Sequence, residues 1–153
     1  MAQPKKTPCM QYCMYYLSRF PKTTHELRIK LLEKWYPEAE IDQAIDFLTA
    51  KDYINDAKFI EAYVQSDIIR KWKVAYLVKQ KLRGKWLDMD LIESIFNQFT
   101  DEIHEATKSA ISKHIDKLKA RGLEGFDIIQ KLMAKGFSLD LIKKVIRERQ
   151  EEK

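Results

Sequence analysis

The feature that most constrains the fold of this chain of 153 residues is a recurrence of about fifty residues. A Lys-Leu-x-x-Lys motif occurs three times, and Met89-Asp90-Leu91-Ile92 after the second copy aligns with Leu139-Asp140-Leu141-Ile142 after the third. A repeat of this size is typical of an array in which no unit buries its apolar face alone. The sequence therefore predicts three tandem units. The copies of the motif span residues 30–34, 81–85 and 131–135.

Apolar residues recur with helical spacing along almost the whole chain, as in Phe59, Ile60, Tyr63, Val64 and Ile68. Only four Gly and four Pro interrupt this pattern, and no segment alternates apolar and polar residues long enough to predict a strand. We therefore predict an all-α fold with nine helices. Each unit should contain a longer helix, a short helix, a tight turn and a closing helix.

Short polar residues mark the predicted starts of several helices. Thr23 and Glu26 have the spacing of a capping box, in which each residue satisfies a backbone amide of the other. Asp56 is interpreted as the N-cap of the long middle helix, which is a structural role. Other starts are predicted at or just after Thr7, Pro37, Asn55, Asp88 and Ser138.

The recurrence also gives boundaries. We predict a flexible N-terminal tail at residues 1–7 and three-helix units at residues 8–51, 52–99 and 100–150, the second of them basic. Because repeat units contact mainly their nearest neighbours, the array should be elongated and curved. Each unit, with its short helix-turn-helix, resembles a DNA-binding fold, although many three-helix bundles bind no DNA.

Net charge bears on the partners of the chain rather than on its fold. The chain carries 28 Lys and Arg residues against 23 Asp and Glu, a formal net charge of +5 and a pI near 9.1. This balance fits nucleic acid or an acidic protein surface as a partner, and equally an ordinary basic protein. Cys9 and Cys13 are interpreted as small core residues in a reducing cytoplasm. The polar residues 1–6 predict no signal peptide, and no apolar run is long enough for a membrane span.

The sequence contains no recognisable catalytic motif: no Gly-rich phosphate loop, no HExxH, no paired Cys ligands and no GxSxG. The three histidines, His25, His104 and His114, lie far apart in the sequence. His114 is one helical turn from apolar residues and is interpreted as a partly buried packing residue. We therefore expect no enzymatic activity, no cofactor and no metal site.

The most informative segment for function is residues 70–86, which contain seven cations and no Asp or Glu. Like charges one helical turn apart, as at Lys79 and Arg83, destabilise a helix by a few tenths of a kcal/mol, which an external phosphate would relieve. A solvated face balanced by acids elsewhere in the fold is the alternative. The candidate binding residues are Arg70, Lys71, Lys73, Lys79, Lys81, Arg83 and Lys85.

Aromatic residues lie close to this basic segment. Tyr53, Trp72, Tyr76 and Trp86 could stack on nucleic-acid bases. Aromatic residues at such spacing more often pack in a core or at a hinge, and we expect that role here.

Three segments resemble the RecX family in order and spacing. They are Tyr53-Ile54-Asn55-Asp56-Ala57-Lys58-Phe59, Val78-Lys79-Gln80-Lys81-Leu82-Arg83-Gly84-Lys85 and Leu132-Met133-Ala134-Lys135-Gly136-Phe137-Ser138. The resemblance covers residues 10–148. The chain departs from the family pattern where a Lys-Gly turn is Lys34-Trp35 and Lys85-Trp86, and where a glycine-rich segment is Lys71-Trp72-Lys73-Val74.

The resemblance implies a regulatory rather than a catalytic role. RecX proteins bind the RecA recombinase and lie in the groove of its nucleoprotein filament, restraining filament growth, ATP hydrolysis, strand exchange and co-protease activity. It implies a cytoplasmic monomer that acts in homologous recombination and the SOS response, with weak electrostatic contact to single- or double-stranded DNA. The alternatives are a helix-turn-helix DNA-binding protein acting without RecA, and a helical scaffold that binds only proteins.

Overall fold

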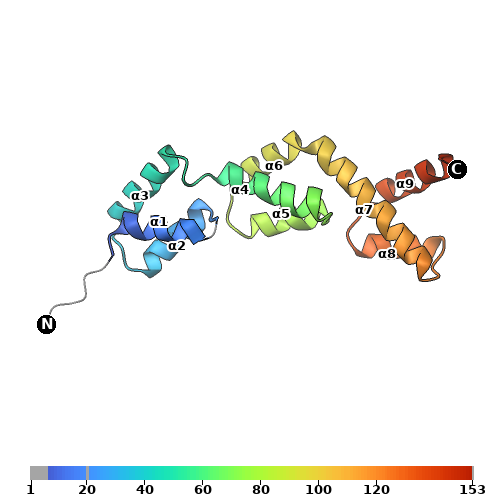
Figure 1. Ribbon diagram of the computed structural model, residues 1–153, viewed down its shortest axis with the longest axis horizontal. Helices are drawn as coiled ribbons and strands as arrows, with labels where there is room; N and C mark the ends of the chain where they lie inside the picture. The colour runs from blue at the N-terminus through green and yellow to red at the C-terminus, as the bar shows by residue number, and fades with distance from the viewer. Residues whose placement is uncertain (1–6, 20, 153) are drawn as a thin grey trace.

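The computed structural model describes residues 7–19 and 21–152. Within these ranges the regular structure is entirely helical, with nine α-helices and one π-helical segment in an elongated, curved array (Figure 1). The predicted all-α fold of tandem three-helix units is confirmed. The flexible tail expected at residues 1–7 lies outside the described residues, apart from Thr7.

The first unit contains α1 (Cys9–Arg19), α2 (Thr24–Glu33) and α3 (Glu38–Ala50). Thr23 caps α2 as predicted, because its Oγ1 accepts a hydrogen bond from the Glu26 amide at 3.1 Å. The return bond of a capping box is not formed among the described residues, since the Glu26 carboxylate lies instead 3.6 Å from the Lys22 ammonium and 3.3 Å from that of Lys85. Cys9 and Cys13 are buried in the core of this unit, which confirms their interpretation as core residues. Burial raises the pKa of the Cys13 thiol to about 12.

The second unit contains α4 (Asp56–Tyr63), η1 (Val64–Arg70), α5 (Ala75–Arg83) and α6 (Met89–Gln98). The first two elements form one continuous long helix, whose second half has the wider π-helical winding. At its end the Lys71 amide donates to the Ser66 carbonyl, five residues back, at 3.1 Å. The long middle helix is thus present, with a change of winding that its apolar spacing did not predict.

Asp56 has a different role from the one predicted. Asn55 is the N-cap of α4, since its side chain accepts from the Lys58 amide at 3.0 Å. The Asp56 carboxylate instead accepts from the backbone amide of Thr24 at 2.9 Å and from its hydroxyl at 3.2 Å. A carboxylate is favourable at a helix N-terminus. Asp56 therefore stabilises the start of α2 and joins the second unit to the first.

The third unit contains α7 (Thr100–Ala120), α8 (Phe126–Ala134) and α9 (Leu139–Glu151). A single residue, Phe99, separates α6 from α7, so the chain passes from the second unit to the third almost without a loop. The 21 residues of α7 span about 30 Å, and the helix packs against η1 as well as against α8 and α9. It therefore acts as the connection between the two units.

Each unit encloses a hydrophobic core of its own. Leu31, Leu82 and Leu132 hold equivalent positions in the repeat, and each is completely buried in a separate cluster. Neighbouring units add only a few side chains, such as Trp72 and Val74 against the third cluster. Each unit thus has a core of its own, but the second and third are completed by neighbours, since Ile103 of α7 packs on the second cluster and Trp72 and Val74 pack on the third.

The tight turn after each second helix contains one residue with a left-handed backbone. The Tyr36 amide donates to the Leu31 carbonyl at 3.2 Å, and the Phe137 amide donates to the Leu132 carbonyl at 3.3 Å, which is the Schellman pattern. Trp35 and Gly136 precede these two donors, and Trp86 holds the equivalent position in the second unit. The φ values are 64° at Trp35, 60° at Trp86 and 105° at Gly136. A residue with a side chain costs about 1–2 kcal/mol in this region, whereas glycine adopts it freely.

The three second helices, α2, α5 and α8, lie along one long edge of the array (Figure 1). The closing helices, α3, α6 and α9, lie along the opposite edge. The turns that carry Trp35, Trp86 and Gly136 thus leave helices on the same edge.

Candidate partner and nucleic-acid interface

The seven candidate cations extend from the end of η1 through α5 to the following turn. Lys79 and Lys85 are half-buried, and the other five are exposed. Three carboxylates from outside the segment 70–86 lie among them, so the question is how many cations stay available to an external anion.

Asp67, a buried acid of η1, lies closest to the start of the segment. Its carboxylate oxygens are 3.8 Å from the Lys71 ammonium and 3.6 Å from the Lys73 ammonium. Glu93 of α6 pairs with two cations of α5. Its carboxylate oxygen is 2.9 Å from the Lys79 ammonium and 3.6 Å from the Arg83 guanidinium. One carboxylate thus serves two cations in each case.

Lys85 pairs across the junction with the first unit, at 3.3 Å from Glu26. In total, five of the seven cations have an internal counter-ion, so the prediction of a segment without one is wrong for these five. Within residues 7–19 and 21–152, Arg70 and Lys81 form no ion pair. Five cations share three carboxylates, so the surface keeps an excess of positive charge.

The cations do not share one face. Lys79 and Arg83 turn toward α6, where Glu93 lies. Lys81 lies on the other side of α5, beside a cavity between the second and third units. The candidate cations of α5 are therefore divided between two sides of this helix.

The cavity at this junction has a volume of about 340 Å³. Trp72, Val74, Leu77, Val78 and Phe137 give it an apolar lining. Its polar lining residues are Asp67, Lys73, Lys81, His114 and Lys135. Three lysines against one carboxylate give this cavity a positive charge, which suits an anionic or phosphate-bearing group.

Comparison with known proteins places the chain in a family. The family model described as "RecX, first three-helix domain" matches residues 9–48. A regulatory protein RecX from Streptococcus sanguinis is 31% identical over 127 residues, which are 82% of this chain and 49% of the relative. The chain belongs to the RecX family. A second RecX relative, from Bacillus pumilus, is 31% identical over 142 residues, 90% of this chain and 54% of its own length.

Solved RecX structures show the same fold. The crystal structure of RecX from Lactobacillus salivarius is 26% identical, with a TM-score of 0.75, and the match covers 92% of this chain and 93% of that one. A second RecX crystal structure, 24% identical, superposes with a TM-score of 0.72. The chain spans about half the length of the curated RecX relatives it matches.

Two further observations bear on the chemistry of this RecX-family chain. Among the residues that the structure describes, no group of three or more His, Cys, Asp or Glu side chains is placed to hold a metal ion. No helix in the same ranges is long and apolar enough to cross a bilayer.

The interpretation of the four aromatic residues is corrected by their exposure. Tyr53, Tyr76 and Trp86 are exposed rather than packed in a core. Trp72 alone packs as expected, half-buried against the third cluster, with the Lys113 ammonium 5.0 Å from its ring centre. Three aromatic rings near the basic segment are thus accessible to a partner.

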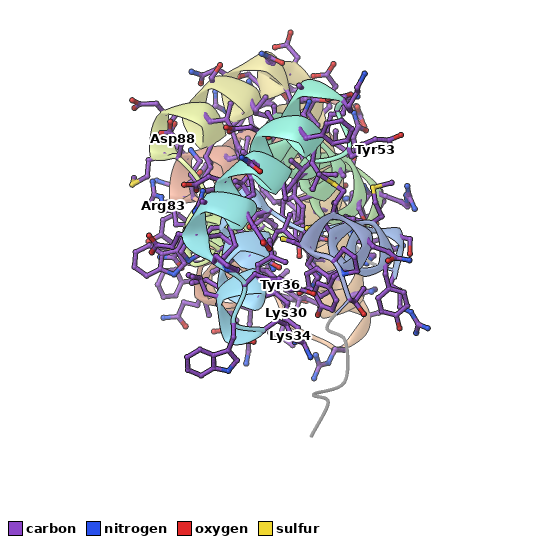
Figure 2. The ribbon with its side chains drawn as sticks, turned by 90° about the vertical axis from the view of Figure 1, so that its left-hand side faces the viewer. Lys30, Lys34, Tyr36, Tyr53, Arg83 and Asp88 are labelled. Atoms are coloured by element: carbon purple, nitrogen blue, oxygen red, sulfur yellow. The ribbon has the colours of Figure 1, made fainter. Side chains whose placement is uncertain are left out.

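The basic site predicted from the sequence lies within the second unit and leaves out two equivalent lysines of the first unit, Lys30 and Lys34. Figure 2 looks along the array from the first unit and shows Lys30 and Lys34 on its lower side, away from Arg83. The recurrent motif itself gave the signal, because these lysines align with Lys81 and Lys85. All four ammonium groups lie over rings of a first helix: Lys30 over Tyr16 at 6.0 Å, Lys34 over Tyr12 at 5.7 Å, Lys81 over Tyr63 at 5.3 Å and Lys85 over Phe59 at 5.7 Å.

His114 is half-buried, with its ring centre 5.8 Å from that of Phe137, which confirms its packing role. Burial, and then the charges of Lys135, Lys117 and Lys113, lower the pKa of its imidazole below 6.5.

Acidification is expected to destabilise the folded chain through His114. Its pKa is lower in the folded than in the unfolded state, so between these values the unfolded chain binds more protons. The contribution of His114 to stability is therefore fully present above about pH 6.5 and is lost as the pH falls through the folded-state pKa. Urea unfolding at about pH 7.5 and about pH 5 measures this loss. His114→Gln should lose less stability than the wild type on acidification, and an equal loss in both would contradict the assignment.

Proposed function

We propose that this protein binds the RecA recombinase and its nucleoprotein filament, and that it restrains the recombinase, ATPase and co-protease activities of RecA. The proposal extends the RecX-family membership to a partner and an effect. It further places the protein in the cytoplasm as a monomer that regulates RecA in homologous recombination and the SOS response. It assigns the chain no catalytic step.

The observation that carries this proposal is the pairing of an elongated, curved array with an excess of exposed cations at its centre. A curved array of this kind suits the groove of a helical polymer. Positive charge at its middle suits a polymer that contains DNA, because each lysine or arginine on a phosphate releases a counter-ion.

We propose that the same seven cations named from the sequence contact DNA phosphate or an acidic surface of the filament. Arg70 and Lys81 are the most available of them, since neither has an ion-pair partner among the described residues. The internally paired cations must exchange a carboxylate for the external anion, so they contribute less binding energy per residue. Contact should therefore be weak, electrostatic and strongly dependent on salt.

We also propose that the chain divides functionally at residues 8–51, 52–99 and 100–150. Support comes from the three separate core clusters, whose buried residues fall within these ranges except for Ile54, which packs in the first cluster from just beyond the first boundary. Under this division the second unit supplies most of the basic contact, and the third unit adds Lys135 at the shared cavity.

The proposal is tested by titrating the protein into the single-strand-dependent ATPase reaction of RecA. We expect a dose-dependent fall in ATP hydrolysis, which becomes weaker as the salt concentration rises. No fall at saturating protein would contradict the proposal. Sequence-selective binding to duplex DNA without RecA would instead favour the helix-turn-helix alternative.

A further inference from the structure

Trp35 and Trp86 combine two unfavourable features. Both have left-handed backbones, with φ of 64° and 60°, at the equivalent position of successive turns. Both side chains are also in solvent, with exposed fractions of 87% and 76%. The third unit has Gly136 at this position, which is the residue that the turn geometry favours. The fold therefore gains no backbone relaxation and little burial from either tryptophan.

Trp72 also has a left-handed backbone, with φ of 58°, but its side chain packs against the third core cluster. Trp35 and Trp86 have no core contact of that kind, so their large side chains in this strained region need an explanation outside core packing. Trp35 is nearly fully exposed, so burial does not stabilise it. Trp86 has a limited contact, with its ring centre 5.5 Å from that of His25 in the first unit. Two exposed indole faces kept in a position built for glycine point to a ligand that stacks on them.

The surroundings of the two tryptophans also repeat. Each directly follows a lysine, Lys34 or Lys85, whose ammonium lies over a ring of the first helix of its unit. Those rings come in pairs: Tyr12 and Tyr16 stack with centres 6.1 Å apart, and Phe59 and Tyr63 lie 5.0 Å apart. The first and second units thus have the same combination of two neighbouring aromatic side chains, two lysines above them and one exposed tryptophan.

We propose that Trp35 and Trp86 are stacking platforms for the unpaired bases of single-stranded nucleic acid, with Lys34 and Lys85 beside the adjoining phosphates. Indole rings stack on any base, and cations next to them follow the backbone, which is how sequence-tolerant single-strand binding works. The same arrangement occurs in two successive units whose second helices share one edge of the array (Figure 1). A nucleic acid strand presents a base and a phosphate at every nucleotide. It therefore matches a repeated pair of tryptophan and lysine better than an irregular protein surface does.

This inference deepens the DNA contact of the proposed function and names the bases as its targets. The proposed stacking involves only this protein and a nucleic acid strand, so its test contains no RecA. A failure to bind the strand through the tryptophans would therefore leave the outcome of the RecA ATPase titration unaffected.

The test measures binding of a fluorescently labelled oligodeoxythymidine strand to the full chain by fluorescence anisotropy. Trp35→Gly and Trp86→Gly should each weaken binding by about 5-fold or more, since stacking on one aromatic ring contributes on this scale. The melting temperature of Trp35→Gly should be unchanged or higher, because glycine relaxes the turn. Binding and stability thus move in opposite directions, which a merely structural tryptophan would not do.

Two controls make the test specific. Phe126→Ala removes another exposed aromatic ring, from the start of α8 in the third unit, and should leave the affinity for the strand unchanged. A strand of the same length with abasic sites should bind the wild type about as weakly as the base-bearing strand binds the double variant Trp35→Gly/Trp86→Gly.

Three outcomes would overturn the proposal. The wild type fails to bind the strand, both glycine variants bind as the wild type does, or the abasic strand binds as tightly as the base-bearing one. Quenching of tryptophan fluorescence by the strand, lost in the double variant that retains only Trp72, would support stacking directly.

Discussion

Reversal of Arg70, Lys81 and Lys135 to glutamate is expected to abolish inhibition of the RecA ATPase. None of the three forms an ion pair among the described residues, so their reversal breaks no ion pair there. Lys81 and Lys135 line the cavity between the second and third units, and Arg70 is exposed at the end of η1. Attraction to phosphate or to an acidic surface becomes repulsion, which costs several kcal/mol at a charged interface. The half-maximal inhibitory concentration should therefore rise about 100-fold or more.

A matched variant distinguishes the position of these charges from the net charge of the chain. Lys51 directly follows α3, Lys143 and Lys144 belong to α9, and all three are exposed. These two helices lie along the edge of the array opposite α5 (Figure 1). Their reversal changes the net charge by the same amount and should leave inhibition within a few-fold of the wild type. Equal loss in the two triple variants would show that only net charge matters. Full inhibition by the Arg70/Lys81/Lys135 variant, with helicity by circular dichroism as a folding control, would remove these cations from the interface.

Leu31→Ala is expected to separate the unfolding of the first unit from that of the other two. Leu31 is completely buried in the first cluster, and truncation of such a side chain costs about 2–5 kcal/mol. The first cluster shares no buried residue with the second, whereas α7 packs directly on η1 and couples the second unit to the third. The first unit should therefore unfold at lower temperature, while the other two unfold together.

Native-state hydrogen exchange measures this effect, because it reports the opening of each helix separately. The amides of α2 and α3 should lose protection in Leu31→Ala, and those of α7 should keep it. Leu32→Ala, at the adjacent half-exposed position, is the control and should change stability by less than about 0.5 kcal/mol. A single sharp transition with a uniform loss of protection would contradict the separation of the cores.

The architecture of this protein can be read from local patterns in its sequence. The fifty-residue recurrence predicts the number of units, and the apolar spacing predicts the helices. Four helix starts are marked by residues whose side chains accept a hydrogen bond from a backbone amide, and these are Thr23, Asn55, Asp88 and Ser138. These properties depend on residues within one or two helical turns of each other. Local spacing therefore encodes them.

Which charges and aromatic rings are available to a partner depends mostly on how the units pack together. The spacing of Asp67 and Lys71 is one helical turn, so this pair was readable from the sequence. Glu26 and Lys85, by contrast, are 59 residues apart and meet only because two units pack end to end. The same holds for the lysines that face one cavity from α5 and from the turn after α8. Long-range contacts and exposure follow from how units pack against one another, and no local pattern along the chain specifies that.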